Sequence, residues 1–203
     1  MDAITQPADL RGHYGPVNPL AARKVLGRLD RHCRHFIGLS PFLVLATADG
    51  HGGVDASPRG DAPGFVQVLD EVTLLLPDRR GNNRVDSFSN LLAAPGLGLI
   101  FFVPGIDETL RVNGSGRIIT DPALLAVSEV QGKIPSAGLL VSVREAFFHC
   151  AKALIRSRLW DPARHVPRAS FPSLGRIIAE QTGACSAEDA ERSTEEGYRT
   201  RLY

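Results

Sequence analysis

An excess of charge of either sign is what this sequence most plainly lacks. Its 203 residues include 23 Lys and Arg against 22 Asp and Glu, which leaves a formal net charge of +1. A nucleic-acid-binding surface requires clustered basic residues, so this balance predicts no nucleic-acid partner. A chain of this length is expected to form one domain with its own core, or one domain with a terminal extension.

Long apolar runs and a cysteine framework are also missing. No apolar run approaches the roughly 20 residues that a membrane helix needs, and residues 1–7 lack the charged and apolar regions of a signal peptide. The cysteines are odd in number and widely spaced, at Cys33, Cys150 and Cys185, which argues against structural disulfides. We therefore expect a soluble, cytoplasmic protein with no membrane partner.

Several catalytic signatures are absent as well. No Gly-x-Gly-x-x-Gly turn follows a predicted strand, which disfavours a Rossmann nucleotide site. No Gly-x-Ser-x-Gly elbow presents a serine nucleophile. His32, Cys33 and His35 form a small cluster, but only the two histidines can share a helix face. Because no second ligand pair follows at a set spacing, no metal site is predicted.

Short apolar runs separated by turns dominate what is present, and such runs are typical of strands. Strands are expected over residues 42–47, 54–57, 65–68, 72–76, 97–103, 109–119 and 139–148. An extended arm is expected over residues 1–18, and helices over residues 20–36, 85–92, 121–127, 149–159, 174–181 and 187–198. Strands linked by hairpins, with few helices between them, predict a mainly β (α+β) fold: an antiparallel barrel with peripheral helices.

One loop carries the chemistry of an anion site. Gly81 is followed by Asn82, Asn83 and Arg84, between an apolar strand and a short helix. Backbone N–H groups at the start of a helix, two side-chain amides and a guanidinium together suit a phosphate dianion. The alternative is an ordinary polar loop in which an asparagine caps the helix.

The run over residues 109–119 alternates with period two. Its polar face includes Thr109, Arg111 and Asn113, roughly 7 Å apart at successive positions on that face. Such a row lines a ligand or a subunit interface, or it forms a solvated sheet face. The Arg79-Arg80 pair, just before the anion-site loop, is expected to be solvated.

Taken together, several segments resemble a known family. They are residues 46–50, 55–61, 81–84 and 108–114, a His-Cys-x-Lys-Ala segment at 149–153, and an Arg-Ser-x-Leu-Trp-Asp segment at 156–161. In this order they resemble the FMN-binding split barrel of the pyridoxamine 5'-phosphate oxidase superfamily. They are most similar to its bacterial branch of uncharacterised FMN-dependent flavoproteins.

The resemblance implies a six- to seven-stranded Greek-key split β-barrel that forms a homodimer, with two FMN sites at the dimer interface. It divides the chain into an N-terminal arm (1–18), an FMN-binding split-barrel domain (19–165) and a C-terminal helical extension (166–203). The resemblance implies that Asn82, Asn83 and Arg84 bind the phosphate of FMN and that Ser87 and Asn90 support their loop by hydrogen bonds.

Further cofactor contacts follow from the same resemblance. One strand segment is expected to pass along the edge of the flavin, with the residues Asp55, Ser57, Pro58, Arg59 and Gly60. Thr109 and Arg111 are expected to line the flavin or the dimer interface, and Arg59 or Arg111 to add positive charge. Lys152 belongs to a segment that closes the pocket, or to a solvated basic helix face beside a buried cysteine.

The implied function is an FMN-dependent oxidoreductase that exchanges two electrons with a small molecule or a nicotinamide donor. No catalytic residue is identified beyond the candidate His149. The segment at 160–166 does not match the substrate-phosphate signature of the pyridoxamine phosphate oxidases, so that substrate is not expected. The alternatives are a flavin-binding protein without turnover, such as a sensor, and a split barrel that binds a deazaflavin or haem.

Overall fold

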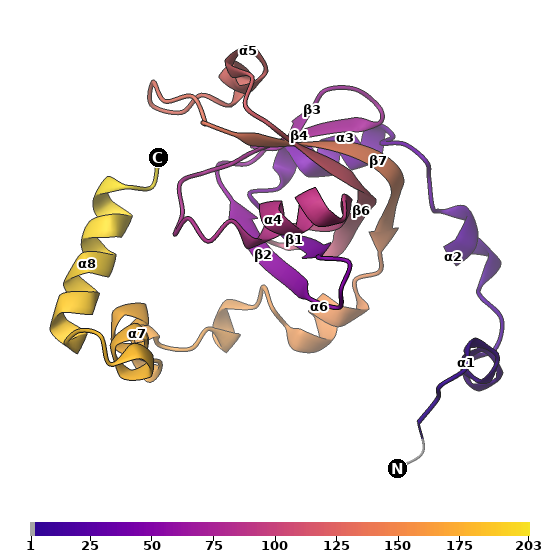
Figure 1. The fold of residues 1–203 in the computed structure, drawn as a ribbon. Coiled ribbons are helices and arrows are strands. Elements are labelled where there is room, and N and C mark those ends of the chain that lie inside the picture. The colour runs from indigo at the N-terminus through magenta and orange to yellow at the C-terminus, as the bar shows by residue number, and fades with distance from the viewer. Residues whose placement is uncertain (1–2) are drawn as a thin grey trace.

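A single antiparallel sheet of seven strands dominates the computed structural model, which describes residues 3–203 (Figure 1). The strands are β1 (Phe42–Ala48), β2 (Val54–Gly60), β3 (Gln67–Val68), β4 (Thr73–Pro77), β5 (Gly96–Val103), β6 (Ile106–Ile119) and β7 (Gly138–His149). They lie in the order β2-β1-β5-β6-β7-β4-β3. The β1–β5 and β4–β7 pairings join strands that are distant in sequence, and the expected mainly β split barrel is confirmed.

Helices surround this sheet rather than alternating with its strands (Figure 1). They are α1 (Pro7–Tyr14), α2 (Pro19–Arg23), α3 (Arg31–Leu39), α4 (Asp86–Ala93), α5 (Pro122–Leu125), α6 (Lys152–Ser157), α7 (Leu174–Thr182) and α8 (Ala187–Thr200). Single 3-10 turns lie at 126–128, 162–164 and 168–170. None of the helices described is long and apolar enough to cross a membrane.

Strand alternation sends one set of side chains into the core and the other set outward. Leu45 of β1 lies opposite Leu99 of β5, which lies opposite Val112 of β6, and all three are buried. The neighbouring residues on these strands, Val44 and Ile100, point the other way and are partly exposed. We call this second side of β2, β1, β5 and β6 the outer face.

The predicted long helix over residues 20–36 is wrong, because a tertiary contact interrupts it. The backbone of Leu26 pairs with Ala146 of β7 in both directions, with N···O distances of 3.0 and 2.8 Å. A new helix then begins at α3, where the carboxylate of Asp30 accepts the N–H groups of His32 and Cys33. Helical spacing alone could not reveal that this stretch joins the sheet.

Two other predictions of local structure also need correction. Part of the expected extended arm forms α1, whose first helical residue is a proline; residues 1 and 2 lie outside the described part of the chain. His149 belongs to the end of β7 instead of starting a helix, and α6 is shorter than expected. Cys150 is exposed, whereas Cys33 is buried in the core.

Candidate functional site

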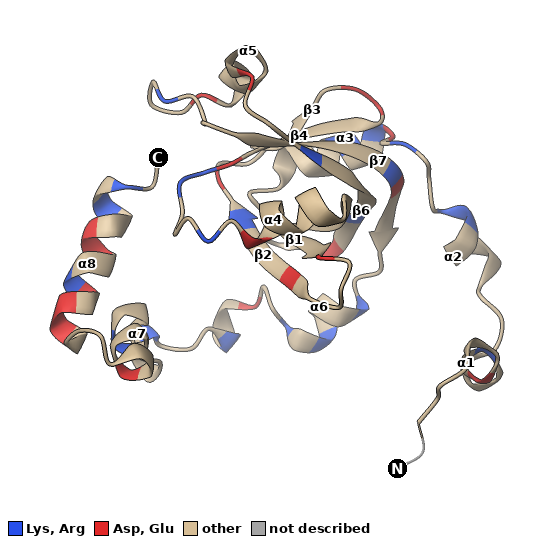
Figure 2. Ribbon diagram, in the orientation of Figure 1, with Lys and Arg blue, Asp and Glu red and all other residues tan. Residues whose placement is uncertain are grey.

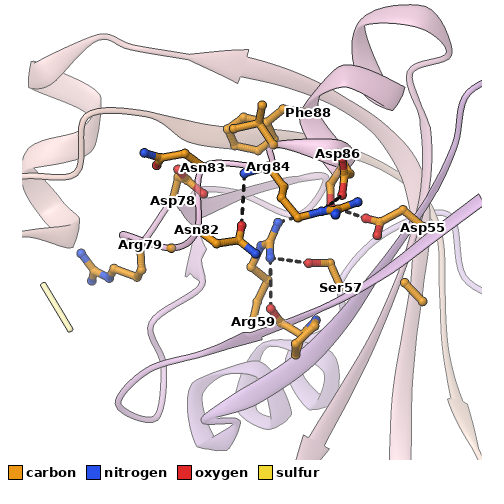
Figure 3. A pocket seen from close by; sticks show the side chains of 15 residues that line it. Asp55, Ser57, Arg59, Asp78, Arg79, Asn82, Asn83, Arg84, Asp86 and Phe88 are labelled. Carbon is orange, nitrogen blue, oxygen red and sulfur yellow. Dashed lines mark hydrogen bonds and ion pairs between the residues drawn. The ribbon is translucent and has the colours of Figure 1, made fainter. Parts of the chain in front are cut away.

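A cavity of about 320 Å³ lies between β2, the loop that follows β4, and the start of α4 (Figure 3). Its walls come from residues 55–59, from Asp78 and Arg79, and from residues 81–88. Helix α4 packs against β1 and β2 and so holds the third wall in place. The cavity therefore joins the two segments that the sequence singled out, although about 20 residues separate them.

One face of β2 supplies the polar floor of this cavity. Asp55, Ser57 and Arg59 alternate along the strand and lie opposite inward-facing residues of β1. Because β2 is an edge strand, its inward side is open to the loop and to α4. The period of the strand thus directs three polar side chains to one site.

The guanidinium of Arg59 is held in the cavity by neutral groups. It donates to Ser57 Oγ at 2.6 Å, to the Pro58 carbonyl at 3.1 Å and to Ser87 Oγ at 3.3 Å. Ser87 in turn donates to Asp55 Oδ2 at 2.5 Å. Among the ion pairs of residues 3–203, none involves Arg59. Its charge therefore remains available to an anionic ligand.

The loop before α4 has an unusual backbone. Asn83 and Val85 have φ values of +59° and +52°, in the left-handed region, and this region is strained for a β-branched residue such as Val85. The amide oxygen of Asn82 accepts the N–H of Arg84 at 3.1 Å. No side chain caps the N-terminus of α4, so the N–H groups of its first turn are free to bind a ligand.

Arg84, the expected charged partner of an anion, lies at the rim and is already paired. Its Nε donates to Asp86 Oδ2 at 2.7 Å, and 72% of the Arg84 side chain is exposed. The hydrogen bond to Asp86 raises the pKa of Arg84 above its usual value. Arg84 thus shares its charge with a carboxylate, whereas the hydrogen bonds of Arg59 go to neutral groups.

Asp78 is a half-buried carboxyl group in the same cavity. Burial raises its pKa above the usual value, and the positive charge of Arg59 only partly offsets this effect. A carboxyl group in an anion site opposes binding when it is ionised. Figure 2 shows the mixture of charges, with basic residues along the loop and acidic residues on β2 and at the start of α4.

Arg79 is not solvated, contrary to the sequence-based expectation. Its Nε donates to Asp61 Oδ2 at 2.6 Å and its Nη1 to the Ser128 carbonyl at 2.9 Å. The side chains of Arg79 and Asp61 are only 18% and 2% exposed. A buried cation needs such a partner, but the two residues are 18 positions apart, so sequence spacing gave no sign of the pair. Arg80 is exposed, as expected.

Eight of the predicted cofactor-binding residues line the cavity: Asp55, Ser57, Pro58, Arg59, Asn82, Asn83, Arg84 and Ser87. Two more adjoin it. Gly60 ends β2, and Asn90, one turn further along α4, donates to Thr47 Oγ1 at 3.1 Å. The cavity also has lining residues that the sequence analysis did not assign to a site, namely Asp78, Arg79, Asp86 and Phe88.

The remaining candidates lie elsewhere in the chain. Thr109 and Arg111 are on the outer face of β6, where the guanidinium of Arg111 lies 5.1 Å from the centre of the Phe147 ring. His149, opposite Thr109, is exposed at the end of β7, and Lys152 is exposed at the start of α6. Within residues 3–203, no group of three or more His, Cys, Asp or Glu side chains is arranged to hold a metal ion.

Comparison with known proteins places these features in a family. The family model described as pyridoxamine 5'-phosphate oxidase matches residues 29–150, which confirms the resemblance read from the sequence and includes every wall of the cavity. No curated protein matches significantly.

Several solved structures are similar to part of this chain at low identity. HupZ from Group A Streptococcus is 15% identical, with a TM-score of 0.48; the match covers 59% of this chain and 92% of that one. An FMN-binding protein from Syntrophomonas wolfei is 10% identical, with a TM-score of 0.47 and coverage of 70% and 96%. A NimC/NimA family protein from Clostridium acetobutylicum is 16% identical, with a TM-score of 0.45 and coverage of 60% and 88%.

Proposed function

The chain belongs to the pyridoxamine 5'-phosphate oxidase family, and on that premise we propose that it is an FMN-binding flavoprotein whose cavity beside α4 holds the cofactor phosphate. The observation that carries this proposal is the Arg59 guanidinium, held on neutral partners beside an uncapped helix N-terminus. A guanidinium and helix N–H groups are well suited to bind a phosphate dianion.

The other lining residues have supporting roles in this proposal. Asn82 and Asn83 offer amide donors from the loop, and the Asp55–Ser87 hydrogen bond keeps Arg59 directed into the cavity. Arg84 adds a contact at the rim, which requires it to share its charge with Asp86. The site thus combines one available cation with several neutral donors.

We further propose that the protein is an oxidoreductase that acts on a small molecule other than pyridoxamine phosphate. Bound FMN supplies the two-electron chemistry, while the chain binds and orients the cofactor and its reaction partner. His149 remains the candidate for moving a proton, because its exposed ring at the end of β7 is accessible to a substrate.

A homodimer is the assembly that we propose. The outer face carries apolar side chains at Phe42, Val44, Val54 and Ile100, with Phe42 39% and Val54 83% exposed. Covering such a surface favours association with a second copy. Arg111 lies on this face, opposite to the side of the sheet that holds the cavity. The family resemblance implies FMN sites at the dimer interface, and we propose that Arg111 contacts the FMN molecule held by the other protomer.

The proposal is tested by titrating cofactor-free protein with FMN and with riboflavin, and following flavin fluorescence. Because the phosphate is the group that the cavity is proposed to bind, FMN should bind at least ~100-fold more tightly than riboflavin, a difference of about 2.7 kcal/mol. Equal affinity for the two flavins would mean that the phosphate lies elsewhere.

Replacement of Asp78 by asparagine should tighten FMN binding by about threefold to tenfold at pH 7, because it removes a negative charge beside the phosphate. The raised pKa of Asp78 fixes the sign of the pH dependence: the repulsion grows as pH rises through that pKa and is absent below it. The advantage of Asp78→Asn over the wild type should therefore shrink as pH is lowered.

Isothermal titration calorimetry between pH 5 and pH 8 measures this effect. Asp9→Asn, on the exposed surface of α1, is the matched control and should leave FMN affinity unchanged. Weaker FMN binding by Asp78→Asn at pH 7 would contradict the assigned repulsion.

A further inference from the structure

The last residues of the described chain return to the barrel after α8 ends. Figure 1 shows the C-terminal end near the loop that precedes α4, while α7 and α8 stand away from the sheet. Tyr203 lines a second cavity, of about 500 Å³, together with Arg79, Arg80 and Lys133. Residues far apart in sequence therefore meet behind the loop that forms the proposed phosphate site.

Tyr203 is tied to the barrel by several specific contacts. Its hydroxyl donates to Asp61 Oδ1 at 2.7 Å, and the Arg79 guanidinium lies 5.5 Å from the centre of its ring. Lys133 Nζ donates to the main-chain oxygen of Tyr203 at 2.9 Å. Asp61 binds Arg79 through its other oxygen. One aromatic residue thus links the loops after β2, β4 and α5.

The contacts of this cluster shift the pKa values of Asp61 and Tyr203 in opposite directions. Burial alone would raise the pKa of Asp61, but hydrogen bonds from Tyr203, the Ala62 N–H and Arg79 outweigh it, so that the net pKa lies below the usual value. Donation to that carboxylate, reinforced by burial, raises the pKa of Tyr203. At neutral pH the cluster therefore contains a carboxylate, a guanidinium and a neutral phenol.

The cluster adjoins the proposed cofactor site directly. Arg79 lines the cavity beside α4, and Asn82 and Asn83 follow it in the same loop. The opposite side of that loop, with Asn82 and Asn83, also borders a cavity of about 580 Å³ against Tyr198 and Arg201. The loop therefore lies between the proposed phosphate site and the C-terminal segment. Arg79, which holds the start of this loop through Asp61 and Ser128, is also the residue that the Tyr203 ring contacts.

We propose that Tyr203 is a positioning residue for the cofactor: by holding Asp61 and Arg79, it keeps the loop of residues 80–84 in the conformation that binds the FMN phosphate. This inference rests on the proposed FMN function. It makes the C-terminal extension part of the cofactor site. It also predicts that removing the contacts of Tyr203 with Asp61 and Arg79 speeds the release of FMN.

The test compares Tyr203→Phe and Tyr203→Ala in the full-length protein. Tyr203→Phe removes the hydrogen bond to Asp61 but keeps the ring beside Arg79, whereas Tyr203→Ala removes both. FMN dissociation is followed by the recovery of flavin fluorescence on dilution, and the stability of the cofactor-free protein by its melting temperature. Tyr14→Phe, at an exposed tyrosine that ends α1 far from this loop in the sequence, is the matched control.

We expect FMN release to be about threefold faster in Tyr203→Phe, because this variant loses a hydrogen bond to a charged group. Release should be faster still in Tyr203→Ala, because this variant also loses the ring contact with Arg79. The cofactor-free protein should melt a few degrees lower in Tyr203→Phe, because Asp61 loses one hydrogen bond, and at the wild-type temperature in Tyr14→Phe. Release rates equal to the wild type in both Tyr203 variants would overturn the inference. A wild-type protein that binds no FMN would instead refute the proposed function.

Discussion

Replacement of Arg59 by alanine is expected to weaken FMN binding by at least ~100-fold, or about 2.7 kcal/mol. Arg59 is the cavity cation whose hydrogen bonds go to Ser57, Pro58 and Ser87 rather than to a carboxylate. Charge-assisted hydrogen bonds to a phosphate are worth roughly 1.5–3 kcal/mol each.

Two further variants show whether the guanidinium itself is responsible. Arg59→Lys keeps the charge but loses the planar fork, so its affinity for FMN should fall between the wild type and Arg59→Ala. Arg34→Ala, on the exposed side of α3, should bind FMN as the wild type does. Affinities are measured by fluorescence quenching. An Arg59→Ala affinity within threefold of the wild type would remove Arg59 from the phosphate site.

Replacement of Ile100 by aspartate is expected to produce a monomer that has lost FMN. Ile100 lies on the outer face, between Val44 of β1 and Arg111 of β6 in the strand register. A carboxylate introduced into this apolar interface must be desolvated at a cost of several kcal/mol, and its cross-strand neighbour Arg111 offsets only part of that cost, so the dimer should dissociate. Because the proposed dimer brings Arg111 of one protomer to the cofactor of the other, cofactor binding should fail together with association.

Analytical ultracentrifugation and flavin content measure the two effects on the same sample. Val127→Asp, at an exposed position in the 3-10 turn after α5, introduces the same charge away from the outer face and should remain dimeric with bound FMN. Circular dichroism verifies that Ile100→Asp remains folded. A folded monomer with wild-type affinity for FMN would show that each cofactor site is complete within one chain.

Much of the fold could be predicted because strand patterns are local. The alternation over residues 109–119 identified β6 and assigned Thr109 and Arg111 to one face. The alternation could not tell which side of the sheet that face is on, since this depends on how the seven-stranded sheet curves around the core. The helix predicted over residues 20–36 failed for a similar reason: the pairing of Leu26 with Ala146 joins residues 120 positions apart.

How much of the candidate site could be predicted also depends on whether its contacts are local or distant in sequence. The sequence brought the β2 segment and the loop before α4 together only through the family resemblance, and the structure places them around one cavity. The sequence analysis assigned the phosphate to Arg84 without considering Asp86, a carboxylate two residues away that pairs with Arg84 in the structure. The roles of Arg79, Asp61 and Tyr203 were beyond prediction, because their contacts join three separate parts of the chain.

The most direct measurement is the absorption spectrum of the purified protein from 300 to 600 nm, followed by mass analysis of the compound released on denaturation. FMN binding predicts two bands near ~375 and ~450 nm and release of a compound with the mass of FMN. A Soret band or the mass of a deazaflavin would contradict FMN as the cofactor. A colourless protein that does not bind added FMN would contradict flavin binding altogether.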